Sequence, residues 1–206
     1  MLKGITNLEK HIENISKYNL PYVVAINRFL TDSEAEVQAL ADWATKHNHP
    51  VALSEVFAKG GEGGIELAKK LVEVVESRDG SKNFKPIYPD NISIEEKIEA
   101  VCKEIYGADG VEFTSAAKNQ LTAISQNGWS NLPVCIAKTQ YSLSDNPVLL
   151  ARPSGFKVTI RELKPSIGAG FIVALAGDIM TMPGLPKVPA ANNIDIDEDG
   201  KIVGLF

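Results

Sequence analysis

Asn27 and Arg28 follow directly after a short apolar run, where polar side chains are well placed to meet a ligand. The run, residues 21–26, is typical of a buried parallel strand, and ligands of α/β proteins collect at the carboxyl ends of such strands. The Asn27 amide has both a donor and an acceptor, which suits it to reading the edge of a base. The other interpretation is that Asn27 only satisfies a turn.

A second apolar run, residues 51–53, is followed by Ser54 and Phe57 and then by a glycine-rich loop over residues 59–64. Phe29 and Phe57 stand at matching places, each just past a predicted strand, so their ring faces could hold a flat ligand between them. Glycines let the backbone approach such a ligand closely. The alternatives are two phenylalanines of the core and a flexible surface loop.

Three other patterns do not make a site. The glycine-rich loop is not a phosphate-binding loop, because Lys59 precedes the glycines, and the pattern GxxxxGK[ST] occurs nowhere in the sequence. Residues 195–206 begin like a calcium loop, but the twelfth position is Phe206 instead of a bidentate Glu, which favours a solvated turn. His47 and His49 could bind zinc, but the sequence indicates no third ligand to complete such a site. We therefore predict no metal ligand and no catalytic residue.

Ala151, Arg152 and Pro153 lie in a rigid loop before a predicted strand. An arginine in such a loop can pair with an anionic ligand or stack on a ring. An ordinary surface loop accounts for the same residues equally well.

The elements that must position these residues alternate along the first 80 residues. Helical periodicity covers residues 8–17, 34–46 and 65–76, and the two apolar runs at 21–26 and 51–53 separate these helices. Alternation of this kind predicts a parallel sheet with helices packed on it.

Residues 77–90 are polar and rich in turn residues, and they mark a domain boundary. Beyond it the sequence predicts helices over 93–105 and 115–126, and strands over 111–113, 133–138, 156–161 and 170–175. From Gly177 onward, prolines and glycines predict an extended tail held against the body. We thus expect an α/β domain over residues 1–80 and a smaller mixed α+β domain over residues 86–206.

Composition excludes several classes of protein. The chain has 206 residues, of which 44% are apolar and 23% charged, as in a soluble globular protein. A net charge of -5 argues against nucleic-acid binding. No apolar run approaches the ~20 residues that span a bilayer, and the N-terminus does not resemble a signal peptide. Cys102 and Cys135 are outside any CxxC, and we expect two reduced, buried thiols in a cytoplasmic protein.

Six stretches resemble the formate–tetrahydrofolate ligases: residues 7–14, 23–29, 53–64, 104–113, 133–146 and 170–206. Together they cover essentially the whole chain. The resemblance implies that the first part is the end of a P-loop-type parallel-sheet domain. It also implies a reaction in which ATP, formate and tetrahydrofolate give 10-formyltetrahydrofolate, ADP and phosphate. Mg²⁺ would accompany the ATP, and a monovalent cation would act as an activator.

The resemblance further implies two groups of binding residues. The nucleotide would be contacted by Asn27, at its adenine, and by Ser54, Ala151, Arg152 and Pro153. The folate would be contacted by Phe29, Phe57, Lys59, Gly60 and Gly61. The two rings would stack on the pterin, and Phe57 stands where the family has a Trp, so that its ring is smaller and lacks the indole N–H.

The resembled family is longer than this chain, and its phosphate loop lies in a portion that precedes the matched part. We therefore expect the chain to be inactive alone and to pair with that N-terminal part or with itself. A different class of function stays open, namely a non-catalytic binding or assembly module that pairs with another chain.

Overall fold

The structure is a computed structural model that describes residues 2–77, 83–179 and 187–204. Its first part confirms the predicted alternation. After the short 3₁₀ helix η1 (Leu2–Gly4), the elements are α1 (Ile5–Lys17), β1 (Val24–Asn27), α2 (Glu34–Lys46), β2 (Val51–Ser54) and α4 (Ile65–Ser77). The segment predicted as a loop is instead α3 (Val56–Lys59) and the 3₁₀ helix η2 (Gly60–Gly64).

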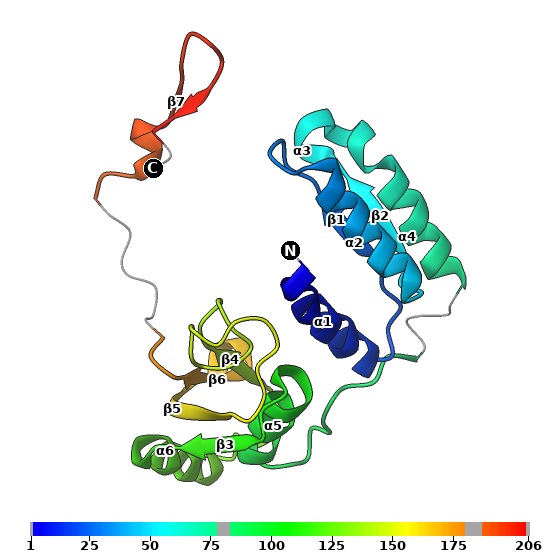
Figure 1. The fold of residues 1–206 in the computed structure, drawn as a ribbon. Coiled ribbons are helices and arrows are strands. Elements are labelled where there is room, and N and C mark those ends of the chain that lie inside the picture. The colour runs from blue at the N-terminus through cyan, green and yellow to red at the C-terminus, as the bar shows by residue number, and fades with distance from the viewer. Residues whose placement is uncertain (1, 78–82, 180–186, 205–206) are drawn as a thin grey trace.

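Strands β1 and β2 form a two-stranded parallel sheet in which Val24 pairs with Val51 and Asn27 with Ser54. Helix α2 begins at a capping box, in which the side chains of Ser33 and Glu36 bond to each other's backbone N–H. The prediction of a buried strand over residues 21–26 holds only in part, because β1 buries Val24 and Ile26 but exposes Ala25 between them. Helices α2 and α4 lie beside this sheet, α2 in contact with both strands and α4 with β2 (Figure 1).

The second part contains a four-stranded mixed sheet in the order β3 (Gly110–Phe113), β5 (Lys157–Ser166), β6 (Phe171–Ala176) and β4 (Val134–Ala137). Strand β3 is parallel to β5, β4 is parallel to β6, and the central pair β5 and β6 is antiparallel. Strand β5 extends five residues beyond the predicted end at 161, because the short 3₁₀ helix η5 (Ile167–Ala169) and Gly170, with φ +78°, turn it back into β6.

Helices α5 (Ile94–Val101) and α6 (Ser115–Gln126) pack against this sheet. The predicted helix over 93–105 continues past α5 as a π-helical turn, η4 (Cys102–Tyr106), which ends at Gly107. Side chains of the helices and the sheet form one core, with Ile98, Val158 and Ile172 fully buried. The prediction of two buried thiols holds for Cys102 and is wrong for Cys135, which is exposed on the edge strand β4.

Helix α1 is joined to this second part by polar contacts. The ammonium groups of Lys10 and Lys17 both donate to the Glu104 carbonyl, each at 2.8 Å. The two connections to the β1–α4 unit run side by side, since the Lys85 N–H donates to the Tyr18 carbonyl at 3.0 Å and the rings of Tyr18 and Phe84 stack. The predicted boundary at residues 77–90 stays a prediction.

The tail differs from its prediction in two ways. Residues 187–204 are all exposed, so this stretch is not held against the body. They include the 3₁₀ helix η6 (Ala190–Asn193) and a small hairpin of β7 (Asp195–Ile196) and β8 (Ile202–Val203), whereas residues 180–186 lie outside the described part of the chain. No helix in the described ranges has the length and apolar character needed to cross a membrane.

Candidate functional site

The structure brings Asn27 and Ser54 together at the carboxyl ends of β1 and β2, where they are partners in the sheet register. Ser54 is buried, and its carbonyl accepts a 3.0 Å hydrogen bond from the Arg28 N–H. Asn27 lines a cavity of about 250 Å³ together with Asp32 and Glu36. Within the described residues its side-chain amide has no hydrogen-bond partner, so both its donor and its acceptor are available.

Phe29 and Phe57 lie next to each other just beyond these strand ends. Their ring centroids are 6.2 Å apart and the ring planes are tilted by 48°. Because Phe29 is 51% exposed and Phe57 is 68% exposed, the alternative that they are core residues is wrong. Stacking contacts need about 3.5 Å on each side of a flat ligand. The rings would therefore have to separate slightly and become parallel to hold one between them.

Charged side chains surround this ring pair. Lys59 donates to the Glu55 carboxylate at 2.6 Å, and the Arg28 guanidinium lies 3.5 Å from Glu55 and in contact with Glu34. The hydrogen bond from Lys59 is the main cause that lowers the pKa of Glu55. The sequence pattern did not single out Glu55, although its position between Ser54 and Phe57 could have drawn attention to it. Lys59 is thus already paired with a carboxylate.

The glycines of this region differ in whether the structure leaves space for a side chain at their positions. Gly60 has φ +59°, a conformation that favours glycine, but a Cβ at Gly60 or Gly61 would meet nothing within 4 Å. At Gly63 a Cβ would lie 2.4 Å from the Glu55 carbonyl oxygen, and the Gly63 carbonyl accepts from the Glu55 N–H. Gly63 was not among the predicted site residues, yet it allows η2 to close against the end of β2.

The loop with Ala151, Arg152 and Pro153 lies elsewhere. The Arg152 guanidinium donates two hydrogen bonds to Glu13 of α1, and Ala151 has φ +60°. No hydrogen bond, ion pair or ring contact within the described ranges joins this loop to Asn27 or Ser54. The structure therefore does not bring together all of the residues predicted to touch the nucleotide.

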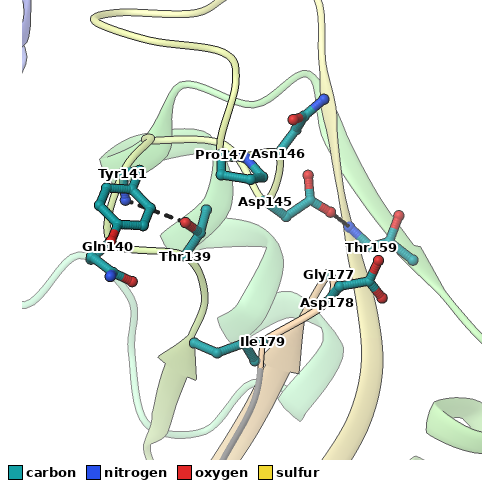
Figure 2. Close-up of a pocket in the computed structure, with 10 residues that line it drawn as sticks. All are labelled: Thr139, Gln140, Tyr141, Asp145, Asn146, Pro147, Thr159, Gly177, Asp178 and Ile179. Atoms are coloured by element: carbon teal, nitrogen blue, oxygen red, sulfur yellow. Dashed lines mark hydrogen bonds between the residues drawn. The ribbon is translucent and has the colours of Figure 1, made fainter.

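A larger cavity, of about 890 Å³, opens at the carboxyl ends of the parallel strands β4 and β6 (Figure 2). Most of the residues that line it are of polar types, and none was predicted as a site residue: Thr139, Gln140, Tyr141, Asp145, Asn146, Pro147, Thr159, Gly177, Asp178 and Ile179. The Thr159 N–H donates to the Asp145 carboxylate at 2.8 Å (Figure 2). Gly177 is needed here, since a Cβ would lie 2.8 Å from the Asp145 carbonyl oxygen.

A lysine fixes one wall of this cavity. The Lys138 ammonium donates to the Thr139 carbonyl at 2.9 Å and to the Ser142 carbonyl, and it lies 5.0 Å from the centre of the Tyr106 ring. Burial lowers the pKa of Lys138 and raises the pKa of Tyr106 to about 12. Because the ammonium is already bonded to carbonyls, Lys138 acts in the structure of the loop. No cluster of three metal-ligating side chains is found among the described residues.

An α/β fold in which parallel strands end in exposed rings and an unbonded amide is typical of proteins that bind flat small molecules at a sheet edge. The whole chain, residues 1–206, matches the sequence model of the formate–tetrahydrofolate ligase family. A formate–tetrahydrofolate ligase of Bacillus pumilus (strain SAFR-032) is 58% identical over 206 residues, which are 100% of this chain and 36% of that relative. The chain belongs to the formate–tetrahydrofolate ligase family, and it spans about a third of the length of this curated relative.

Proposed function

We propose that this chain supplies the pterin-stacking and adenine-side surfaces of a formate–tetrahydrofolate ligase. The observation that carries the proposal is the pair of exposed rings, Phe29 and Phe57, at the carboxyl ends of two parallel strands. A pterin is flat and would stack on both ring faces. In this proposal Lys59, Gly60 and Gly61 form the adjoining wall, and the complete reaction joins formate to tetrahydrofolate at the expense of ATP.

The nucleotide would lie beside the same sheet edge. The unbonded Asn27 amide suits the adenine, and Ser54 lies next to it in the register. The residues at this edge do not suit the phosphates, because Arg28 and Lys59 are already paired with carboxylates. The phosphates, with Mg²⁺ and a monovalent cation, would accordingly be held by a P-loop-type domain of which residues 1–80 are the end.

We infer that the chain is inactive by itself. Phosphoryl transfer depends on groups that hold the γ-phosphate and neutralise its charge, and the pattern GxxxxGK[ST] is absent from the sequence. The chain would work in the cytoplasm with a partner that carries the phosphate loop.

A second candidate function, a non-catalytic assembly module, is favoured by apolar surface on the first part. Leu71, Val72 and Val75 of α4 are each half exposed, and the sheet below them has two strands. Two-stranded sheets are marginal without further packing, so this surface suits a protein partner or a second copy of the chain.

Calorimetric titration of tetrahydrofolate without oxygen tests the first proposal. We expect saturable binding at one site that weakens at least about tenfold in the Phe29→Ala, Phe57→Ala double variant, because both stacking faces are lost. Tyr141→Ala is the matched control, since Tyr141 is 67% exposed and lies at the other cavity. No binding by folded chain, or equal binding by the double variant, would favour the assembly module.

A further inference from the structure

We propose that the larger cavity, at the carboxyl ends of β4 and β6, binds a small organic cation with an ammonium or guanidinium group on an apolar stem. The inference goes beyond the proposed function, because none of the residues that line this cavity belongs to the ring pair or to the ends of β1 and β2. The volume of about 890 Å³ is in the range of small-molecule sites and exceeds what a single side chain fills.

The first observation is a pair of carboxylates that lack an ion pair. Asp145 and Asp178 line the cavity on the side of Thr159 (Figure 2). The Thr159 N–H bonds to one Asp145 oxygen, which leaves the other oxygen free, and the Asp178 carboxylate has no bonded partner in the described part of the chain. Lys138 pairs with neither, because its ammonium is bonded to backbone carbonyls. A cation in the cavity would be attracted by both charges.

The second observation is an aromatic and apolar surface next to these charges. The Tyr141 ring is 67% exposed, and in Figure 2 it lies apart from the two carboxylates with Pro147 drawn between them. Ile179 adds a second apolar side chain to the lining. Cations are attracted to aromatic faces, and long amines bury their stems on apolar surface while the charged head stays with polar groups. The lining therefore suits a ligand with an apolar stem and one charged end.

The charges of the lining distinguish between classes of ligand. A phosphate or carboxylate would be repelled, since the described lining residues include two acids and no basic residue. A neutral polyol would bond to amides such as that of Gln140, but it would displace water from both carboxylates without pairing with their charge. An ammonium or guanidinium group donates strong, charge-assisted hydrogen bonds to carboxylates. The lining thus favours a cation.

The third observation is that the loop bearing these groups is fixed in place. Ser144 is fully buried, and its hydroxyl donates to the Asn146 carbonyl at 3.0 Å and accepts from the Asn146 N–H at 3.1 Å. The Ser142 hydroxyl accepts from the Ser144 N–H at 2.9 Å. Across the cavity, the backbone of Gly177 approaches the Asp145 carbonyl too closely for a Cβ. The two carboxylates are therefore positioned before a ligand arrives, which lowers the cost of binding.

The test is a titration of 2-phenylethylamine into the whole chain at neutral pH, followed through the amide resonances by NMR. The ring of this probe matches Tyr141 and its ammonium matches the carboxylates, while 2-phenylethanol is the neutral counterpart of the same shape. We expect the amine to shift the resonances of Gln140 and Gly177 with saturation at about millimolar concentrations. The alcohol should bind at least about tenfold more weakly, because it has no charge to pair with the carboxylates.

Three variants locate the site. Asp178→Asn should weaken the amine about fivefold to tenfold and leave the alcohol and the Tm unchanged, because this carboxylate supports no other group. Tyr141→Ala should weaken both probes, because both lose the ring face. Asp199→Asn is the matched control, since this exposed aspartate lies in the tail and not in the cavity lining, and it should change neither.

Several outcomes would overturn the inference. Equal affinity for the amine and the alcohol would mean that charge does not select the ligand. Unchanged amine binding in Asp178→Asn, or no saturable binding by the wild-type chain, would remove the cavity as a cation site. Loss of amine binding after mixing with the preceding portion of the Bacillus pumilus ligase would mean that a side chain of another chain fills the cavity, which contradicts a small-molecule ligand. The folate titration is independent of all these results.

Discussion

At the scale of single residues, we expect Phe57 to determine how tightly the pterin of the proposed site is held. Its ring is 68% exposed and 6.2 Å from that of Phe29, so the pair presents aromatic surface without burying it in the core. The paired strand-end positions could be predicted from the sequence, because each ring follows an apolar run. The contact of the Glu55 carboxylate with Arg28 could not, since it arises only when the strands pair, whereas the pairing of Glu55 with Lys59 is local, at a spacing of four residues.

Replacing Phe57 by Trp should tighten tetrahydrofolate binding about threefold to tenfold. An indole offers a larger stacking face and an N–H donor, and aromatic contacts of this kind contribute roughly 0.5–1.5 kcal/mol beyond area burial. Anaerobic calorimetry on the variant and the wild-type chain measures the change. Phe84→Trp is the control, because that exposed ring stacks on Tyr18 instead. Equal affinity in both variants would argue that Phe57 does not touch the pterin.

At the scale of elements, the helices and strands were largely predictable because their apolar residues recur at regular spacing. Where the observed elements differ from the predicted ones, the cause is a contact between residues that are not neighbours in the sequence. Residues 56–64 form short helices instead of a loop because the backbone of Gly63, which has no Cβ, can approach and hydrogen-bond the backbone of Glu55. Likewise β5 reaches Ser166 because β6 pairs with it. The pairing of Glu13 with Arg152, 139 residues away, has no local pattern at all.

Replacing Gly63 by Ala should destabilise the first part of the chain. The new Cβ would lie 2.4 Å from the Glu55 carbonyl oxygen, and relieving such overlap costs about 1–3 kcal/mol. Thermal unfolding followed by circular dichroism should show a lower Tm, with weaker tetrahydrofolate binding. Gly61→Ala is the matched control, since a Cβ there meets nothing within 4 Å, and its Tm should be unchanged. A normal Tm in Gly63→Ala would contradict the packing of η2 on β2.

At the scale of the whole molecule, the two parts differ in how fully their apolar side chains are buried. The four-stranded sheet of the second part has a continuous core with its helices. The two-stranded sheet of the first part leaves Leu71, Val72 and Val75 half exposed. The whole chain matches 36% of the Bacillus pumilus relative, and we propose that part of that relative's remaining length packs on the first part.

Mixing this chain with a chain that carries the preceding portion of the Bacillus pumilus ligase should produce 10-formyltetrahydrofolate that depends on ATP and formate. Each component alone should be inactive, because one lacks the phosphate loop and the other lacks the ring pair. The Phe29→Ala, Phe57→Ala variant in the same mixture is the control and should give far less product. Product from this chain alone, or no product from two chains that co-elute, would contradict the proposal that each chain supplies a part of one active site.

The side-by-side connections at Tyr18 and Lys85 have a consequence for protein engineering. A 3.0 Å hydrogen bond joins the backbone on both sides of the β1–α4 unit, so the chain leaves and rejoins the body at nearly one point. That is the geometry of an inserted module. Cutting out the residues between these two points and closing the gap with a short flexible peptide should yield a smaller stand-alone protein, into which a foreign domain with neighbouring termini can be grafted.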